Sequence, residues 1–218
     1  MKAVKEISAL LLVLIISVML AACGGAPSGS TTEPQTTADA KTTAALPDET
    51  AETPTQPETK AGSGKTLVVY FSATGTTKGV AEQIAAAANA DTYEILAAQT
   101  YTADDLNWND TNSRTTKEQN DKSVRPEIGS EKISLDGYDT IFIGFPIWWG
   151  EEPRIMDTFV ESYDFSGKTM IPFCTSGGSG IGSSGDNLKA NAGSGNWLEG
   201  ARLSGSSDIE GWVSGYNL

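Results

Sequence analysis

The chain has 218 residues, a formal net charge of −13 and no histidine. Its acidic balance argues against a nucleic-acid partner, because phosphate backbones are bound by patches of lysine and arginine. Without histidine, the chain can have neither a Ser-His-Asp triad nor a histidine metal ligand. Its two cysteines are too few for a four-thiolate zinc site or a disulfide framework, so we expect no metal site.

The first 23 residues have the pattern of a secretion signal. Two lysines precede an apolar run, 7–20, which is shorter than the about 20 residues that a comfortable membrane span needs. Leu20-Ala21-Ala22-Cys23 follows and resembles the lipobox of bacterial lipoprotein signals. The resemblance implies a signal peptide over 1–22 that is cleaved before Cys23, diacylglycerol with acyl chains such as palmitate on the Cys23 sulfur, and anchoring at the extracytoplasmic face of the cell membrane. An ordinary signal peptide or a buried helix is the alternative.

A polar stretch follows the cysteine. Residues 24–64 contain no aromatic residue, and Leu46 is their only leucine, isoleucine, valine or methionine. Such a stretch cannot bury enough apolar surface to offset the entropy of ordering it. We therefore expect a disordered linker rich in threonine and proline over 23–64. One domain, 65–218, then holds every aromatic residue of the chain.

Residues 65–218 alternate predicted strands with predicted helices. Short apolar runs mark strands at 67–71, 92–96, 140–145, 169–173 and 198–203. Helical spacing and capping residues mark helices near 80–88, 113–122, 153–162, 186–191 and 209–216. The polar stretch over 97–135 otherwise predicts loop. This alternation predicts an α/β fold, a doubly wound five-stranded parallel sheet with helices on both faces.

Three loops after predicted strands are poor in charge and rich in Gly, Ser, Thr or Trp. We name them the first loop (72–77), the second loop (146–150) and the third loop (175–180). Ligands of doubly wound sheets bind beyond the carboxyl ends of the strands. We therefore expect these loops to share one site.

The first loop is suited to a phosphate. Ser72, Thr74, Thr76 and Thr77 supply four hydroxyls, and Gly75 permits a tight turn before the positive end of a helix. The loop lacks the Gly-Lys-Ser/Thr ending of a Walker A motif and the Gly-x-Gly-x-x-Gly pattern of dinucleotide sites. The alternative is a turn whose hydroxyls only cap the helix, for which one would suffice.

Ser72-x-Thr74-Gly75-x-Thr77, directly after an apolar strand, resembles the phosphate loop of the flavodoxin-like family. The segments 138–150, 167–180 and 198–203 are similar to a bacterial branch of that family. This resemblance implies a sheet order of 2-1-3-4-5 and non-covalent flavin mononucleotide (FMN).

The second loop offers a platform for a flat, largely apolar ring. It consists of Pro146, Ile147, Trp148, Trp149 and Gly150. We expect one indole to pack on the flavin and the other to lie beside it or in the wall. The alternative is that both indoles belong to the core or to a surface for a partner.

The third loop permits close backbone approach to the polar edge of such a ring. Its candidate residues are Thr175, Ser176, Gly177 and Gly178. The alternative is a loop that contacts nothing. Many short-chain flavodoxins have an aromatic residue here that covers the second ring face, and this chain has none. That face is then open, or covered by 97–125, and an open face suits a nicotinamide or a quinone.

Other residues have simpler interpretations. Cys174 is expected in the core, and Glu151 and Glu152 at a solvated helix start. Tyr101, Trp108 and Arg114 are expected in the core or on the surface, and the alternative is that they cover the flavin or face a partner. Our leading functional hypothesis is a membrane-anchored, FMN-binding redox protein that transfers electrons to a partner protein. The alternatives are an NAD(P)H- or quinone-linked flavin reductase and a non-redox binding lipoprotein that has lost flavin.

Overall fold

The computed structural model describes residues 64–216 and residue 218. The predicted signal peptide, Cys23 and nearly all of the predicted linker lie outside the described residues. One parallel sheet contains β1 (Lys65–Phe71), β2 (Asp91–Ile95), β3 (Tyr138–Pro146), β4 (Thr169–Thr175), β5 (Asn196–Trp197) and β6 (Ala201–Arg202). Its order is β2-β1-β3-β4-β5, with β6 also paired to β4. The expected fold class and strand order are confirmed.

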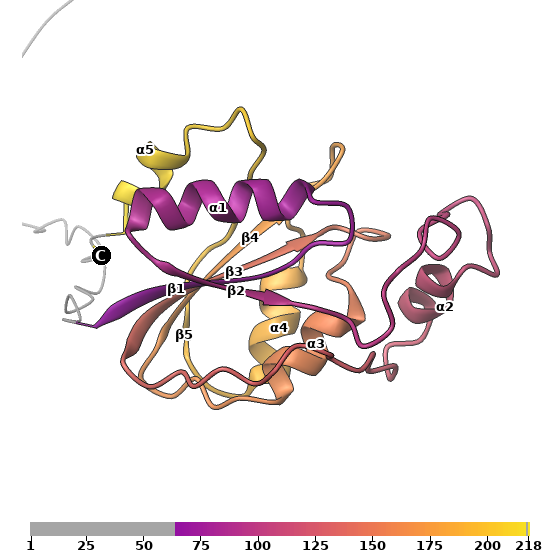
Figure 1. The fold of residues 1–218 in the computed structure, drawn as a ribbon, viewed down its shortest axis with the longest axis horizontal. Coiled ribbons are helices and arrows are strands. Elements are labelled where there is room, and N and C mark those ends of the chain that lie inside the picture. Colours follow the sequence, from indigo (N-terminus) through magenta and orange to yellow (C-terminus); the bar gives the residue numbers. More distant parts are fainter. Residues whose placement is uncertain (1–63, 217) are drawn as a thin grey trace, which may run out of the picture. The chain divides into compact units, whose positions relative to one another are not determined.

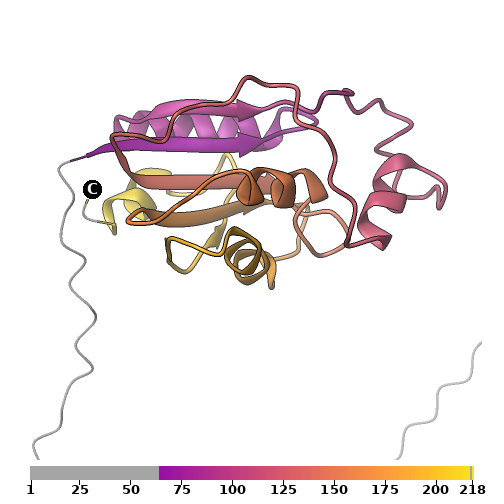
Figure 2. The ribbon, with the colours of Figure 1, turned by 90° about the horizontal axis from the view of Figure 1, so that it is seen from below.

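Helices cover both faces of this sheet (Figures 1 and 2). On one face lie α1 (Thr76–Ala88) and α5 (Ile209–Ser214), and on the other lie α3 (Arg154–Glu161) and α4 (Ser184–Ala192). The first helix forms because Val80, Ala81 and Ile84 return at helical spacing and are buried together. Asn89 ends it in a left-handed conformation, as its position after the apolar pattern predicts.

The core is split between the two faces of the sheet. In β1, Val68 and Tyr70 belong to the cluster under α1 and α5, whereas Leu67, Val69 and Phe71 belong to the cluster on the other side. A strand with both faces covered reads as a continuous apolar run, which is why this strand is evident in the sequence.

The strand predicted at 198–203 is wrong in its extent. Two short strands, β5 and β6, pair with β4 instead. Pro172 in the middle of β4 has no N–H to donate to a neighbouring strand. The chain passes close to it at Gly200, where an added Cβ would lie 2.6 Å from the Pro172 carbonyl oxygen. The pairing resumes one residue out of register, from Met170 with Trp197 to Phe173 with Ala201. The proline therefore interrupts the edge strand.

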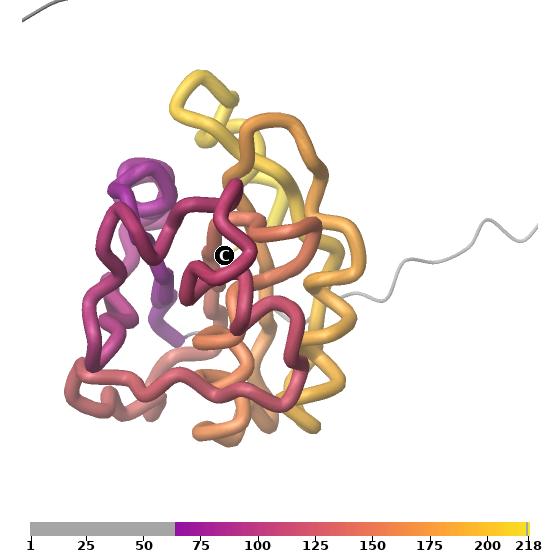
Figure 3. The backbone as a smooth tube through the Cα atoms, turned by 90° about the vertical axis from the view of Figure 1, so that its right-hand side faces the viewer, coloured from indigo at the N-terminus to yellow at the C-terminus, as the bar shows by residue number. Residues whose placement is uncertain are grey.

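The first part of the polar segment 97–135, with α2, lies past the end at which the strands terminate, and its last part runs back beside the sheet to the start of β3 (Figures 1 and 3). It contains α2 (Arg114–Asn120), close to the predicted helix. Ser113 caps this helix, because its side chain accepts a hydrogen bond from the Thr116 N–H. Within residues 64–216 and 218, no helix has the length and apolar character to cross a membrane.

Candidate functional site

The structure brings the three loops together at the carboxyl ends of β1, β3 and β4. Thr175 joins them: its hydroxyl lies 2.8 Å from the Thr77 hydroxyl, and its carbonyl oxygen accepts a hydrogen bond of 2.9 Å from the Ile147 N–H. Both threonine side chains are buried. Pro146, the last residue of β3, pairs in register with Thr175. The loops therefore have a fixed relation to one another.

The first loop leaves the start of α1 open. Gly75 turns the chain with a φ of 88°, and its N–H donates to the Ser72 hydroxyl at 3.1 Å. No side chain caps α1, and no acceptor among the described residues takes the N–H groups of residues 76–78. The hydroxyls of Thr74 and Thr76 are exposed and 3.4 Å apart. Unpaired N–H groups beside exposed hydroxyls are the hydrogen-bond donors that a phosphate needs.

The nearest cation does not dominate this loop. Lys78 forms an ion pair of 2.9 Å with Glu94, and that hydrogen bond raises the pKa of Lys78. The capping alternative also fails, because none of the loop hydroxyls accepts from the first turn of α1. An anion at this position would be bound by N–H dipoles and hydroxyls rather than by a lysine.

The second loop places its two indoles differently. The ring of Trp148 packs edge-to-face on Phe71 at 5.6 Å and on Tyr101 at 5.2 Å, so it belongs to the wall. The side chain of Trp149 is 45% exposed, and its φ of 49° is left-handed. Trp149 is thus the indole that stands free at the end of the sheet, and Gly150 follows with a φ of 83°.

The third loop presents backbone rather than side chains. The Ser176 hydroxyl donates to the Ser179 carbonyl oxygen and accepts from the Gly178 N–H at 3.3 Å. A Cβ added to Gly177 or Gly178 would meet no atom within 4 Å. Arg202 donates to the Ser176 carbonyl oxygen at 3.4 Å. The loop is therefore internally bonded and open toward solvent.

Comparisons with known proteins identify the family. The family model described as flavodoxin matches residues 65–216. The chain belongs to the flavodoxin family. None of the curated proteins compared with it matches.

Solved structures agree with this assignment. The chain is similar to a provisionally assigned flavoprotein from Bacteroides uniformis, with 50% identity, a TM-score of 0.67, and coverage of 69% of this chain and 98% of that chain. A second, from Bacteroides eggerthii, has 47% identity and a TM-score of 0.67, covering 71% of this chain and 99% of that one. A flavoprotein from Lactobacillus acidophilus, solved in complex with FMN, shares the fold at 24% identity and a TM-score of 0.55, covering 68% and 98%.

Tyr101 of this flavodoxin-family chain lies in the core, one of the two positions expected from the sequence. Its buried hydroxyl donates to Glu118 at 2.8 Å, and the Arg114 guanidinium lies 3.9 Å above its ring. Burial raises the pKa of Tyr101, with the Glu118 hydrogen bond acting in the same direction. A recess of about 280 Å³ lies beside it at the ends of β1 and β2, lined by residues that include Ser72 and Leu96.

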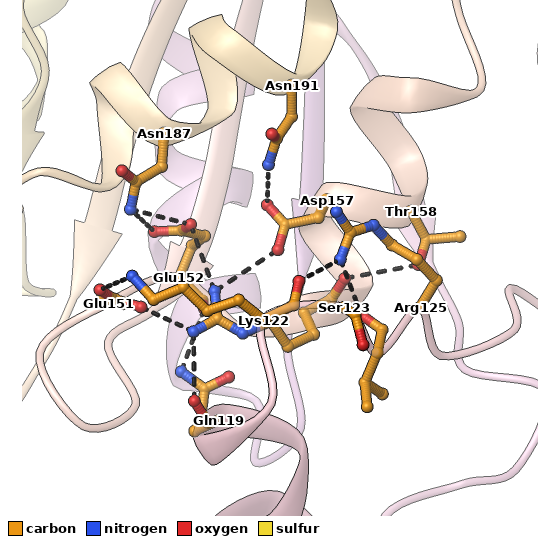
Figure 4. A network of polar contacts seen from close by, with 12 residues as sticks. Gln119, Lys122, Ser123, Arg125, Glu151, Glu152, Asp157, Thr158, Asn187 and Asn191 are labelled. Carbon is orange, nitrogen blue, oxygen red and sulfur yellow. Dashed lines mark hydrogen bonds and ion pairs between the residues drawn. The ribbon is translucent and has the colours of Figure 1, made fainter.

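The expectation of solvated acids at the start of α3 is wrong. Glu152 is only 1% exposed, and Arg154 is 3% exposed. The Arg154 guanidinium lies 2.6 Å from Glu151, 3.6 Å from Glu152 and 3.5 Å from Asp157. We call these four side chains the α3 network (Figure 4). Glu151 and Asp157 lie three residues before and after Arg154, a spacing visible in the sequence, whereas Glu152 lies two residues before it.

The neighbouring helix α4 adds hydrogen bonds to the α3 network. Asn187 and Asn191 of α4 donate to Glu152 and Asp157, as Figure 4 shows. Burial raises the pKa of Glu152 and that of Asp157. By contrast, hydrogen bonds from Lys122 and Arg154 lower the pKa of Glu151. One buried guanidinium therefore serves two buried carboxyls, both of which bind protons more readily than usual.

The other expected features are simpler. Among residues 64–216 and 218, no group of three or more Cys, Asp or Glu side chains is arranged to hold a metal ion. Cys174 is fully buried, and burial raises the pKa of its thiol to about 11. It packs as a core residue, as the sequence predicts. Trp108 is exposed.

Proposed function

We propose that the chain binds FMN without a covalent bond and transfers electrons through it while tethered to the outer face of a bacterial membrane. The observation that supports this most is the open start of α1. Free N–H groups and the exposed hydroxyls of Thr74 and Thr76 lie where the first loop meets the other two. The FMN-bound relative from Lactobacillus acidophilus shares this fold, which supports the choice of ligand.

Each loop has a distinct task in this proposal. Ser72, Thr74, Thr76 and the N–H groups around Gly75 hold the phosphate. Trp149 of the second loop packs on the ring, while Trp148 supports the wall through Phe71. The backbone at Gly177 and Gly178 approaches the polar edge of the ring. Bound flavin supplies one- and two-electron redox chemistry, and the protein supplies binding and electrostatics.

An absorption spectrum tests the proposal. The purified protein is incubated with excess FMN and passed through a desalting column. We expect it to retain about one flavin per chain, with a visible spectrum that differs from that of free FMN. A colourless protein would overturn the proposal in favour of a binding lipoprotein without flavin.

A reductase is the second candidate. It is favoured by the third loop, which has no aromatic side chain to cover the second ring face. A nicotinamide or a quinone could then stack there. Steady-state turnover of the flavin-loaded protein with NAD(P)H and a quinone, in the absence of a partner protein, would support the reductase. Reduction only through an added redox partner protein would support the carrier.

The anchor is proposed from the sequence alone. Leu20-Ala21-Ala22-Cys23 fits the lipobox pattern, which places lipid on Cys23. Acyl chains contribute about 0.8 kcal/mol per buried CH₂, so two or three of them give durable anchoring. Labelled palmitate should enter the wild-type protein in a bacterial host and leave Cys23→Ala unlabelled. Equal labelling of both would contradict the assignment.

A further inference from the structure

The tight turn that carries Trp149 has an unusual sequence. The N–H of Trp148 donates to the Glu151 carbonyl oxygen at 2.9 Å, and the N–H of Glu151 donates back to the Trp148 oxygen at 3.1 Å. Both central residues, Trp149 and Gly150, have φ in the left-handed region, at 49° and 83°. Turns of this kind favour Asn-Gly, because a bulky side chain is strained at positive φ. Contacts from outside the turn must therefore stabilise Trp149 in this conformation.

The strongest outside contact comes from α2. The buried amide of Gln119 donates to the Trp148 carbonyl oxygen at 2.9 Å and to the Glu152 carbonyl oxygen at 3.2 Å. The Gln119 side chain thus bonds to the backbone at both ends of the turn: at Trp148, its first residue, and at Glu152, the residue that follows it. Figure 4 shows Gln119 rising from α2 toward this region. The Trp148 oxygen then accepts two hydrogen bonds, so its orientation is fixed.

The α3 network strengthens this attachment. Arg154 donates to the Gln119 carbonyl oxygen at 3.3 Å and to the Glu151 carboxylate at 2.6 Å. Lys122, just after α2, donates to the other Glu151 oxygen at 2.8 Å. The turn is therefore bonded to the polar segment 97–135 through its backbone, by Gln119, and through the side chain of its last residue, Glu151, by Lys122.

We propose that Gln119 is a positioning residue for flavin binding. It holds the turn in the conformation that presents the Trp149 indole to the ring before the ring arrives. A preformed contact surface binds more tightly, because less conformational entropy is lost on binding. This inference rests on the proposed FMN binding and gives the segment 97–135 a role in it.

A double-mutant cycle tests the coupling. Gln119→Met keeps the approximate volume of the side chain and removes the donor, and FMN affinity is measured by fluorescence quenching. We expect about five- to tenfold weaker binding in the wild-type background and less than about twofold in a Trp149→Ala background. The control is Gln83→Met on α1, which also removes a side-chain donor to a backbone oxygen and should not change affinity. An equal loss in both backgrounds would overturn the proposal.

Amide hydrogen exchange of the flavin-free protein gives a readout that does not depend on FMN. Gln119→Met should speed exchange over residues 148–151, and Gln83→Met should not. Unchanged exchange would overturn the positioning role even if FMN binds normally. If the wild-type protein binds no FMN, the proposed function fails, and this exchange result alone decides whether Gln119 holds the turn.

A second variant covers the case in which Gln119→Met does not fold. Lys122 is largely exposed, so Lys122→Met removes its contact with Glu151 at little risk to folding. We expect a smaller loss of FMN affinity, about twofold, that also disappears in the Trp149→Ala background. A loss that persists in that background would contradict the proposal.

Discussion

The two helical layers meet the same sheet in different ways. The helices α1 and α5 bury no charged side chain, and most of their buried residues are apolar. On the opposite face, α3 buries Arg154 and Asp157 among its apolar residues, and Glu152 is buried just before it. A helix can thus pack on this sheet without burying a charge, so the buried charges of α3 need another explanation. Arg154 bonds to Glu151, the last residue of the turn that carries Trp149, and we interpret the buried charges as support for this turn.

The same contrast divides the candidate site. The apolar layer contributes the start of α1, with its free N–H groups, which in the proposed site binds the phosphate end of the ligand. The charged layer contributes the turn before α3, with Trp149, which in the proposed site contacts the ring end. Variants on the two sides should therefore have separable effects.

The largest effect is expected from Arg154→Met. It leaves the buried carboxyls of Glu152 and Asp157 without their guanidinium, which we expect to cost about 3–5 kcal/mol of unfolding free energy. Because burial raises the pKa of both carboxyls, the loss should be larger at pH 8 than at pH 5, where they are closer to neutral. Urea denaturation at both pH values measures this. Lys189→Met, at an exposed position on α4, is the control.

The apolar layer should respond differently. Ile84→Ala removes fully buried apolar volume under α1 and should cost about 2–5 kcal/mol. Its loss should be the same at pH 5 and pH 8, because the titratable groups of that cluster are tyrosines such as Tyr70, whose raised pKa keeps the phenol protonated at both pH values. A loss of unfolding free energy in Ile84→Ala that changes strongly with pH would contradict the proposed difference between the two helical layers.

The phosphate end is tested by Thr74→Val. It removes an exposed hydroxyl of the first loop, and each lost hydrogen bond to a charged group costs about 1.5–3 kcal/mol. FMN affinity should fall more than tenfold, whereas riboflavin, which lacks the phosphate, should bind as it does to the wild-type protein. Thr111→Val, at an exposed position in the segment 97–135, serves as the matched control. Unchanged FMN affinity would remove Thr74 from the site.

The ring end is tested by comparing the two indoles. Trp149→Ala should weaken FMN and riboflavin alike, by about 0.5–1.5 kcal/mol, and leave unfolding unchanged, because its side chain is partly exposed. Trp148→Ala should lower stability instead, since its ring packs on Phe71 and Tyr101. The opposite pattern would place Trp148 against the ring.

The smallest effect concerns Glu152→Gln. The pKa of Glu152 is raised in the folded protein, so the native state binds the proton more tightly than the unfolded chain does. That contribution to stability is present below the unfolded pKa and is lost as pH rises through the folded pKa. Unfolding free energy measured from pH 4 to pH 8 should therefore decline less in Glu152→Gln than in the wild-type protein. If the unfolding free energy declined equally in Glu152→Gln and in the wild-type protein, Glu152 would not be the source of the pH dependence.

Much of the fold was predictable because its signals are local. The run Leu67–Phe71 is apolar throughout, and the loops after β1, β3 and β4 are short and poor in charge. The resemblance of the first loop to flavodoxins then supplied the strand order. These features depend on few residues that are adjacent in the sequence, so tertiary structure does not override them.

The errors came from contacts between distant segments. Glu151 and Glu152 look solvated in sequence, and only the fold brings the distant Lys122 and Asn187 to them. It also buries Glu152 and Arg154. The edge strand was misplaced because its pairing depends on Pro172 of β4. Gln119 carries no signal, since a glutamine in a polar helix gives no hint of a bond 29 residues away.

A crystal structure of the protein grown with FMN tests the central claim most directly. We predict the phosphate at the start of α1, within hydrogen-bond distance of Thr74 and Thr76, and the ring against Trp149 between the second and third loops. Flavin bound elsewhere, for example in the recess beside Tyr101, or no flavin at saturating concentration, would contradict the account.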